Sequence, residues 1–210
     1  VKKGLIRPQL LEKDIVEDEL LLRYSRQILL PEIDVAGQMQ LIESSVLLLG
    51  LGGLGSVVSM YLAAAGVGNL ILVDDDDVEL SNLQRQIVHT TDRIGEKKVE
   101  SAKRNLMALN PNTTITTIDR VLDEEGFNQV ISDVDIIVDA TDNFDSRFFI
   151  NRQSIKHVKP LVSGAATRLE GQISVFNSTA DSPCYECLYS RGTSEQSESC
   201  SESGVVAPLL

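Results

Sequence analysis

The glycines of the segment GLGGLG, residues 50–55, have a spacing that suits phosphate binding. They fit the pattern G-x-G-x-x-G, follow the apolar run Val46–Leu49, and precede an apolar segment that predicts a helix. Such glycines permit a tight turn, and the free N–H groups at the start of the next helix attract a phosphate. The segment therefore predicts a nucleotide site approached by Gly50, Gly52 and Gly53, with glycines that only tighten packing as the alternative.

A carboxylate for the ribose is predicted at the end of the next strand. Asp74 follows the expected strand 69–73 and lies 19 residues beyond Gly55. A carboxylate in this position commonly accepts hydrogen bonds from ribose hydroxyls. We assign Asp76 to the same cofactor site, whereas Asp75 and Asp77 are interpreted as a solvated acidic loop.

Two cations favour a triphosphate over a dinucleotide. Asn82 and Arg85 are three residues apart, so that they face the same way on one helical turn, and Lys98 follows in GEKK. Cations at the mouth of the sheet would offset the charge that builds on a transferring phosphorus and on departing pyrophosphate. The stretch DATDN, residues 139–143, ends the fourth predicted strand, and a carboxylate at that strand end is well placed to hold Mg²⁺ on phosphate oxygens. For each residue alone, a surface role is the alternative.

The order of the predicted elements indicates an α/β protein with a Rossmann-like, doubly wound and mostly parallel sheet. An N-terminal helical arm and a C-terminal antiparallel extension flank it. The expected helices are 17–30, 34–42 with Asp34 as N-cap, 57–65 closed by Gly66 and Gly68, 95–109, 123–132 and 143–157. The expected strands are 46–49, 69–73, 114–119, 135–139, a fifth that opens with residues 160–163, and 172–177. Residues 182–203 are expected to form a loop. His89 and His157 are interpreted as structural residues.

The composition restricts the class of partner. The 210 residues include 19 basic and 31 acidic side chains, a net charge of −12. Without a Lys/Arg-rich run, so acidic a chain is a poor candidate for binding nucleic acid or an anionic membrane. No apolar stretch is long enough to cross a bilayer, and there are only three cysteines. We therefore expect one cytoplasmic domain over residues 1–210.

The chain resembles the MoeB/ThiF branch of the adenylating enzymes that activate ubiquitin-like proteins, which includes the adenylyltransferases of molybdopterin and thiamin synthesis. The resemblance runs from about Leu20 to the last residue. The motifs that carry it are RYSRQ (23–27), GLGGLG (50–55), the pattern D-x-D-x-V-x-x-S-N-L-x-R-Q (74–86), G-x-x-K (95–98), ATDN (140–143), SGAATRLEGQISVF (163–176), C-x-x-C (184–187) and GVVAPL (204–209).

The resemblance implies an enzyme that binds MgATP and the Gly-Gly tail of a ubiquitin-like sulfur-carrier protein. The terminal carboxylate of the carrier would attack the α-phosphorus, giving an acyl-adenylate and pyrophosphate. The implied roles are ribose binding by Asp74, phosphate contacts by Asn82, Arg85 and Lys98, and Mg²⁺ binding by Asp142. The pathway that the carrier serves, molybdopterin, thiamin or another, stays open.

The resemblance also implies a homodimer. Arg26 matches an arginine that reaches the triphosphate bound by the neighbouring subunit, so that one site would draw on two chains. From the sequence alone, Arg26 is a surface cation on an amphipathic helix.

The cysteines predict an incomplete metal site. Cys184 and Cys187 supply half of a tetrahedral zinc site, and relatives supply a second pair further on, so we expect the natural protein to continue past Leu210. A redox C-x-x-C is the alternative, but it would belong at a helix start in a βαβ unit rather than after a hairpin. Cys200 aligns with a cysteine that, in some relatives, bonds covalently to the carrier. Its acidic and neutral neighbours give no sign of an activated thiol.

Three other functions remain open at this stage. The same fold could activate a small molecule or a tRNA base, although the acidic charge argues against RNA. It could be a non-catalytic partner subunit, which would be expected to lack Arg85, Lys98 or Asp142. A NAD-dependent dehydrogenase would bind NADH rather than ATP.

Overall fold

The computed structural model describes residues 18–179, 181–189 and 206 and divides into two compact units, Val1–Gln40 and Leu41–Leu210. In the first unit, α1 (Asp18–Arg23) and α2 (Ser25–Ile28) are separated by a turn at Tyr24, so the single helix predicted over 17–30 is wrong. α3 (Asp34–Glu43) begins in this unit. The Asp34 carboxylate accepts hydrogen bonds from the backbone N–H groups of Ala36 (2.6 Å) and Gly37 (3.2 Å), which confirms the predicted cap.

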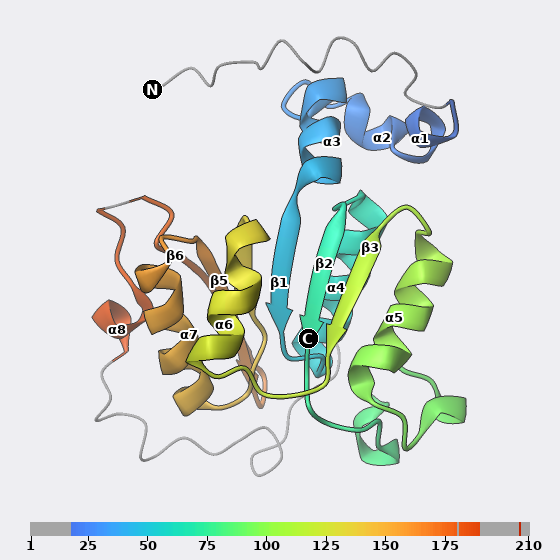
Figure 1. Cartoon of the computed structure of the whole chain (residues 1–210). Coiled ribbons are helices and arrows are strands. Elements are labelled where there is room, and N and C mark those ends of the chain that lie inside the picture. Colours follow the sequence, from blue (N-terminus) through green and yellow to red (C-terminus); the bar gives the residue numbers. More distant parts are fainter. Residues whose placement is uncertain (1–17, 180, 190–205, 207–210) are drawn as a thin grey trace. The chain divides into compact units, whose positions relative to one another are not determined.

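The second unit is built on a sheet whose six described strands have the order β3-β2-β1-β4-β5-β6 (Figure 1). The strands are β1 (Ser45–Leu49), β2 (Asn69–Val73), β3 (Thr114–Ile118), β4 (Ile136–Asp139), β5 (Leu161–Thr167) and β6 (Glu170–Phe176). The first five are parallel, and β6 pairs antiparallel with β5. This confirms the Rossmann-like, doubly wound sheet and its antiparallel extension.

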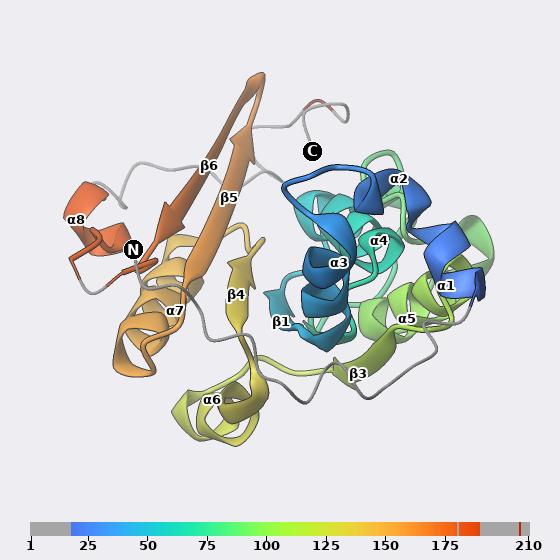
Figure 2. The same cartoon turned by 90° about the horizontal axis from the view of Figure 1, so that it is seen from above.

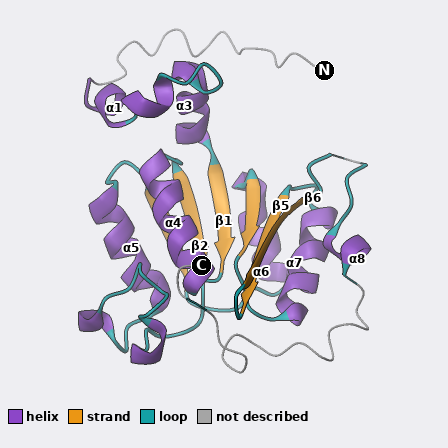
Figure 3. Ribbon diagram, turned by 180° about the vertical axis from the view of Figure 1, so that it is seen from behind, coloured by secondary structure: helices purple, strands orange, loops and turns teal. Residues whose placement is uncertain are grey.

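Helices cover both faces of the sheet (Figures 2 and 3). α4 (Gly53–Ala65) and α5 (Lys98–Leu109) lie on one face, and α6 (Glu124–Val130) and α7 (Phe144–Lys156) lie on the other. All five residues of β1 are buried, because Val46 and Leu48 pack towards α4 and α5 while Leu47 and Leu49 pack towards α6 and α7. A strand covered on both faces has no polar alternation, as its sequence predicts.

The two glycines after α4 have different roles. Gly66 ends the helix in the left-handed conformation (φ 90°), as predicted. Gly68 does not cap it. A Cβ on Gly68 would lie 1.7 Å from the carbonyl oxygen of Ile42, and the Gly68 N–H donates to the carbonyl of Leu41. Gly68 is therefore required by the close approach of the chain that leads into β1, not by the helix end.

Several element boundaries differ from the sequence prediction. α5 begins at Lys98 rather than at residue 95, because Gly95 adopts φ 88° and Asp77 and Lys97 form a short β-bridge. β5 extends to Thr167 and β6 begins at Glu170, since the two strands pair along their whole length as a hairpin. The predicted loop 182–203 contains a short helix, α8 (Tyr185–Leu188), in its described part. The remaining described helical turns are the 3₁₀ segments Leu80–Asn82, Thr91–Arg93 and Ile131–Asp133.

The strand order places a functional site at one edge of the sheet. The chain leaves β1 towards β2 on one side, and β4 lies on the other side of β1. At such a switch point the loops leave the strand ends in opposite directions and open a crevice beyond the carboxyl ends. Among the described residues, no helix is both long and apolar enough to cross a membrane.

Candidate functional site

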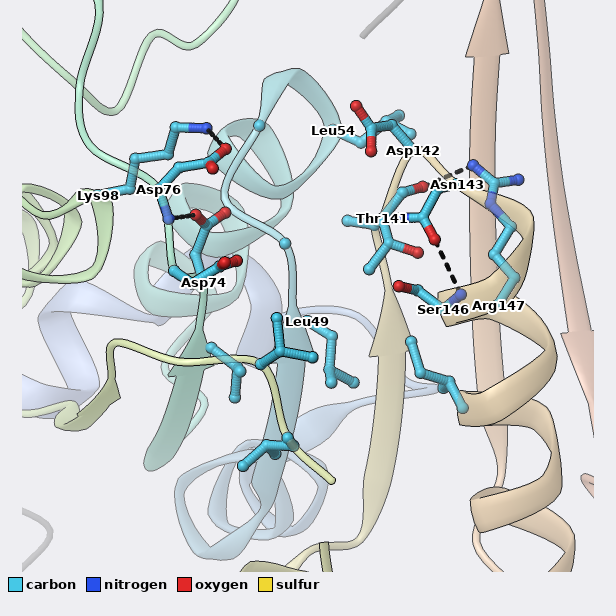
Figure 4. A pocket seen from close by; sticks show the side chains of 18 of the residues that line it. Leu49, Leu54, Asp74, Asp76, Lys98, Thr141, Asp142, Asn143, Ser146 and Arg147 are labelled. Carbon is cyan, nitrogen blue, oxygen red and sulfur yellow. Dashed lines mark hydrogen bonds and ion pairs between the residues drawn. The ribbon is translucent and has the colours of Figure 1, made fainter. Parts of the chain in front are cut away.

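A cavity of about 300 Å³ opens at the carboxyl ends of β1, β2 and β4 (Figure 4). Eight of the residues predicted for the site line it: Gly50, Gly52, Gly53, Asp74, Asp76, Arg85, Lys98 and Asp142. They come from three connections, β1–α4, β2–α5 and β4–α7, which the parallel strands bring to the same edge. The cavity is large enough for a small ligand such as a nucleotide.

The glycine loop packs so tightly that two positions exclude a side chain. Gly50 adopts φ 91°, and a Cβ there would lie 2.7 Å from the carbonyl oxygen of Ala140. A Cβ on Gly55 would lie only 1.9 Å from the carbonyl oxygen of Gly50. The loop therefore folds back against the end of β4 and the start of α4. Gly52 and Gly53 are left lining the cavity where the first turn of α4 has unpaired N–H groups.

Asp74 supports the glycine loop as well as lining the cavity. One carboxylate oxygen accepts the N–H of Leu51 at 2.6 Å, and the other accepts the N–H of Asp76 at 3.0 Å. Burial raises the pKa of Asp74, whereas the Lys98 charge and these two N–H groups act in the opposite direction. Each carboxylate oxygen keeps a further lone pair, so Asp74 can accept a ligand hydroxyl while it holds the loop.

The two predicted cations are held by neighbouring polar groups. The Lys98 side chain is almost wholly buried, and its Nζ lies 2.6 Å from a carboxylate oxygen of the exposed Asp76. The Arg85 guanidinium donates to the Asn82 side chain at 3.1 Å, as their spacing predicts, and more weakly to the carbonyl of Ser81 at 3.4 Å. Asn82 is not among the residues that line the cavity and reaches it through Arg85.

The turn between β4 and α7 presents Asp142 to the cavity. Asp139, at the end of β4, is 1% exposed and accepts hydrogen bonds from the N–H and hydroxyl of Thr141 and from the hydroxyl of Ser163. Burial raises the pKa of Asp139, opposed by these bonds and by the Arg147 charge. Asp142 is exposed and makes no hydrogen bond or ion pair with any described residue. In Figure 4 its carboxylate and Lys98 lie on opposite sides of the glycine loop.

The donors present at this edge suit Mg²⁺ bound together with phosphate. Carboxylate oxygens are the protein ligands that Mg²⁺ prefers, and the ion usually takes one or two of them beside phosphate oxygens. The unpaired carboxylate of Asp142 faces the cavity and could supply one. Asp74, Asp75 and Asp76 also gather their carboxylates within 4.8 Å of one another, although Asp76 is paired with Lys98.

The C-x-x-C pair lies on α8 and does not line the cavity. The sulfur atoms of Cys184 and Cys187 are 3.4 Å apart, close to the roughly 3.8 Å that two thiolates of a tetrahedral zinc site would show. For Cys184, burial raises the pKa, but hydrogen bonds from Cys187 and nearby groups outweigh it and leave the pKa lowered. Cys184 is the N-cap of the four-residue helix α8, which follows the β5–β6 hairpin and does not belong to a βαβ unit, as the sequence predicts. Among the described residues, these two thiols are half of the ligand set that a tetrahedral zinc site would need.

Two further predicted residues lie elsewhere. Arg26 is exposed on α2, in the N-terminal unit. Cys200 lies outside the described residues.

Other residues that line the cavity were not predicted. They include the polar side chains Gln86, Arg120, Ser146 and Arg147 and the aromatic rings of Phe127 and Phe149. Arg147 lies one helical turn after Asn143, which caps α7, and its guanidinium donates to the carbonyl of Thr141 at 2.6 Å. That spacing could have pointed to Arg147 from the sequence. The rings come from two helices whose packing only the folded chain decides.

Comparison with known proteins identifies the family. The model of the ThiF family matches residues 24–210. The chain belongs to the ThiF family. It is 48% identical over 195 residues to the molybdopterin-synthase adenylyltransferase of Escherichia coli (strain K12), covering 93% of this chain and 78% of that one. It is 40% identical over 195 residues to the sulfur carrier protein ThiS adenylyltransferase of the same organism, covering 93% and 77%.

Solved structures share the fold. E. coli MccB with MccA-N7isoASN superposes with a TM-score of 0.74 at 25% identity, covering 89% of this chain and 59% of that one. E. coli MccB with ATP gives a TM-score of 0.71 at the same identity, with 89% and 58% covered. The chain thus spans less than two thirds of the length of these solved chains.

Proposed function

We propose that this chain is an ATP-dependent adenylyltransferase whose substrate is the C-terminal glycine carboxylate of a ubiquitin-like sulfur-carrier protein. The observation that carries the proposal is the convergence at one cavity of a glycine loop, two cations and an unpaired carboxylate. That set matches the needs of a triphosphate whose α-phosphorus is attacked. The names of the relatives support the adenylyltransferase chemistry and the sulfur carrier.

Each residue has a role in binding ATP. The first turn of α4, with Gly52 and Gly53, receives phosphate oxygens. Asp74 accepts a ribose hydroxyl on the lone pairs that the loop leaves free. When ATP binds, Lys98 leaves its ion pair with Asp76 and pairs with a phosphate group. Its positive charge therefore has a partner both with and without ATP.

The reaction needs no general base. The α-carboxyl group of a protein has a pKa of roughly 3.5, so the attacking group is already a carboxylate at neutral pH. One of its oxygens forms a bond to the α-phosphorus, and the bond from that phosphorus to the bridging oxygen breaks. The electron pair leaves with pyrophosphate, and the other product is the acyl-adenylate. Arg85 and Lys98 stabilise the charge that develops on the leaving group.

Asp142 would hold Mg²⁺ at this site. When bound, the ion offsets phosphate charge and orients the leaving pyrophosphate. Thr141 and Asp139 fix the turn from which Asp142 reaches the cavity, because Asp139 accepts both donors of Thr141.

The oligomeric and thiol assignments belong to the same proposal. We place the enzyme in the cytoplasm as a homodimer in which Arg26 reaches the neighbouring subunit's triphosphate. Cys184 and Cys187 would bind structural Zn²⁺ together with two ligands from outside the described residues. Cys200 would be the residue that bonds to the carrier, if such an intermediate forms.

The test is ATP–pyrophosphate exchange with the purified protein, Mg²⁺ and a panel of carrier proteins that end in Gly-Gly. We expect exchange that depends on one carrier. Asp142→Asn should abolish it without changing the melting temperature. Asp145→Asn is the matched control, because Asp145 is an exposed carboxylate three residues further on, in the first turn of α7, and does not line the cavity. ATP binding without exchange for any carrier would contradict the proposal and favour a small molecule, a tRNA base or a non-catalytic subunit.

A further inference from the structure

His89 is a buried histidine behind the nucleotide cavity. Its side chain is 5% exposed, and it is not among the residues that line the cavity. Nδ1 lies 3.0 Å from the hydroxyl of Ser101, and Nε2 lies 3.2 Å from the backbone carbonyl of Leu51. The ring therefore bridges two segments that both belong to the site: the glycine loop and α5.

The partners of His89 decide which nitrogen carries the proton. The carbonyl of Leu51 can only accept a hydrogen bond, so Nε2 must carry the hydrogen. In a neutral ring Nδ1 is then an acceptor, and the Ser101 hydroxyl donates to it. Burial lowers the pKa of His89 to about 4, and the nearby charges of Lys98 and Arg93 act in the same direction. The ring is accordingly neutral, with one tautomer, at neutral pH.

The backbone of Leu51, within the glycine loop, is held from both sides. Its N–H donates to Asp74 at 2.6 Å, and its carbonyl accepts the bond from His89. The hydroxyl of Ser56, the other group near this carbonyl, is farther away at 3.5 Å. The loop position is thus set jointly by a carboxylate at the end of β2 and by His89.

The other end of the bridge is on α5, the helix that carries Lys98, the cation assigned to phosphate binding. Ser101 lies three residues after Lys98 on α5, so both face the same side of the helix, and both are buried. The carbonyl of Ser101 also accepts a bond from Arg93 at 2.6 Å, which ties the preceding loop to the same turn. A shift of the His89 ring would therefore change the distance between the glycine loop and Lys98.

We propose that His89 is a positioning residue for MgATP, which sets the spacing between the glycine loop and Lys98 through a neutral Ser101–His89–Leu51 bridge. The inference rests on the proposed function, since it assumes that the cavity takes MgATP. His89 does not contact the nucleotide. It acts through the Leu51 carbonyl on one side and through Ser101 on the other.

The test compares two amide replacements by isothermal titration with MgATP. The amide nitrogen of glutamine can take the place of Nε2, whereas the shorter asparagine can replace only Nδ1. We expect His89→Gln to bind MgATP within about threefold of the wild type and His89→Asn to bind it at least tenfold more weakly, because a misplacement near 1 Å is costly at such sites. Equal MgATP affinity in the wild type and both variants would overturn the inference.

A second pair of variants separates positioning from general stability. Ser101→Ala removes the bridge at its far end. Ser59→Ala removes a hydroxyl that is equally buried and donates only to a carbonyl within α4. We expect similar losses of melting temperature but weaker MgATP binding in Ser101→Ala alone. If both serine variants bind MgATP equally well, His89 is merely structural. A wild type that binds MgATP but shows no exchange would refute the proposed function and leave this inference standing, so the two failures are distinguishable.

Discussion

The substitution Gly55→Ala tests how tightly the nucleotide loop is built. A Cβ at Gly55 would lie 1.9 Å from the carbonyl oxygen of Gly50 and 2.8 Å from its carbon. Both are backbone atoms, so no side chain can rotate away. To reach an ordinary contact, the start of α4 and the loop must separate by about 1.5 Å.

The size of the effect follows from that displacement. Overpacking of a buried site costs roughly 1–3 kcal/mol, which for a chain of this size lowers the melting temperature by roughly 3–10 °C. A shift above 1 Å at the phosphate-binding turn should also reduce the exchange rate by about a hundredfold. The loss of activity should exceed what the fraction of unfolded protein explains, since most of the variant stays folded at 25 °C.

The assay is thermal unfolding followed by ATP–pyrophosphate exchange on the same preparation. Gly52→Ala is the matched control for stability, because the nearest atom to its added Cβ is the Gln86 side-chain nitrogen at 3.8 Å, an ordinary contact. Its melting temperature should stay within about 1 °C of the wild type. If Gly55→Ala and Gly52→Ala have the same melting temperature, the loop can adapt to the added methyl group, and the predicted steric conflict at Gly55 is refuted.

Three further predictions concern charge and thiols. Lys98→Met should weaken MgATP binding, measured by titration calorimetry, roughly tenfold to a hundredfold. Lys97→Met, which removes an exposed lysine paired with Asp77, should leave the affinity unchanged. Equal effects of the two substitutions would contradict the assignment of Lys98 to phosphate binding. His89 is neutral in the folded state, so its contribution to the free energy of unfolding is complete above pH 6.5 and falls as the pH drops towards 4. In urea titrations between pH 7 and 5, the wild type should lose about 2 kcal/mol more free energy of unfolding than His89→Gln. The same pH dependence in both proteins would refute this. Cys184→Ser, with Cys187 left in place, should lower the zinc content of the purified protein, and metal analysis showing an unchanged content would exclude the pair as ligands.

The central strand, the glycine loop and the cap residues could be predicted because their signals are local. A short unbroken apolar run that ends at a glycine turn indicates a strand covered on both faces, and Asp34 and Gly66 act on N–H and carbonyl groups within a few residues. The helix predicted over 17–30 was wrong because an apolar stripe does not reveal a turn such as the one at Tyr24. The strand ends at which Asp74 and Asp142 stand were predictable for the same local reason.

The sequence alone determined which residues stand at the strand ends, and hence which groups could meet a triphosphate. Tertiary structure decided what surrounds them. The buried carboxylate of Asp139 accepts a hydrogen bond from Ser163, 24 residues away, and the carbonyl of Leu51 is held by His89, 38 residues away. The strand order of the sheet creates these neighbours, and no periodicity encodes them. A hydrogen bond across two loops depends on where both loops are placed, and that placement exists only once the core around β1 has formed.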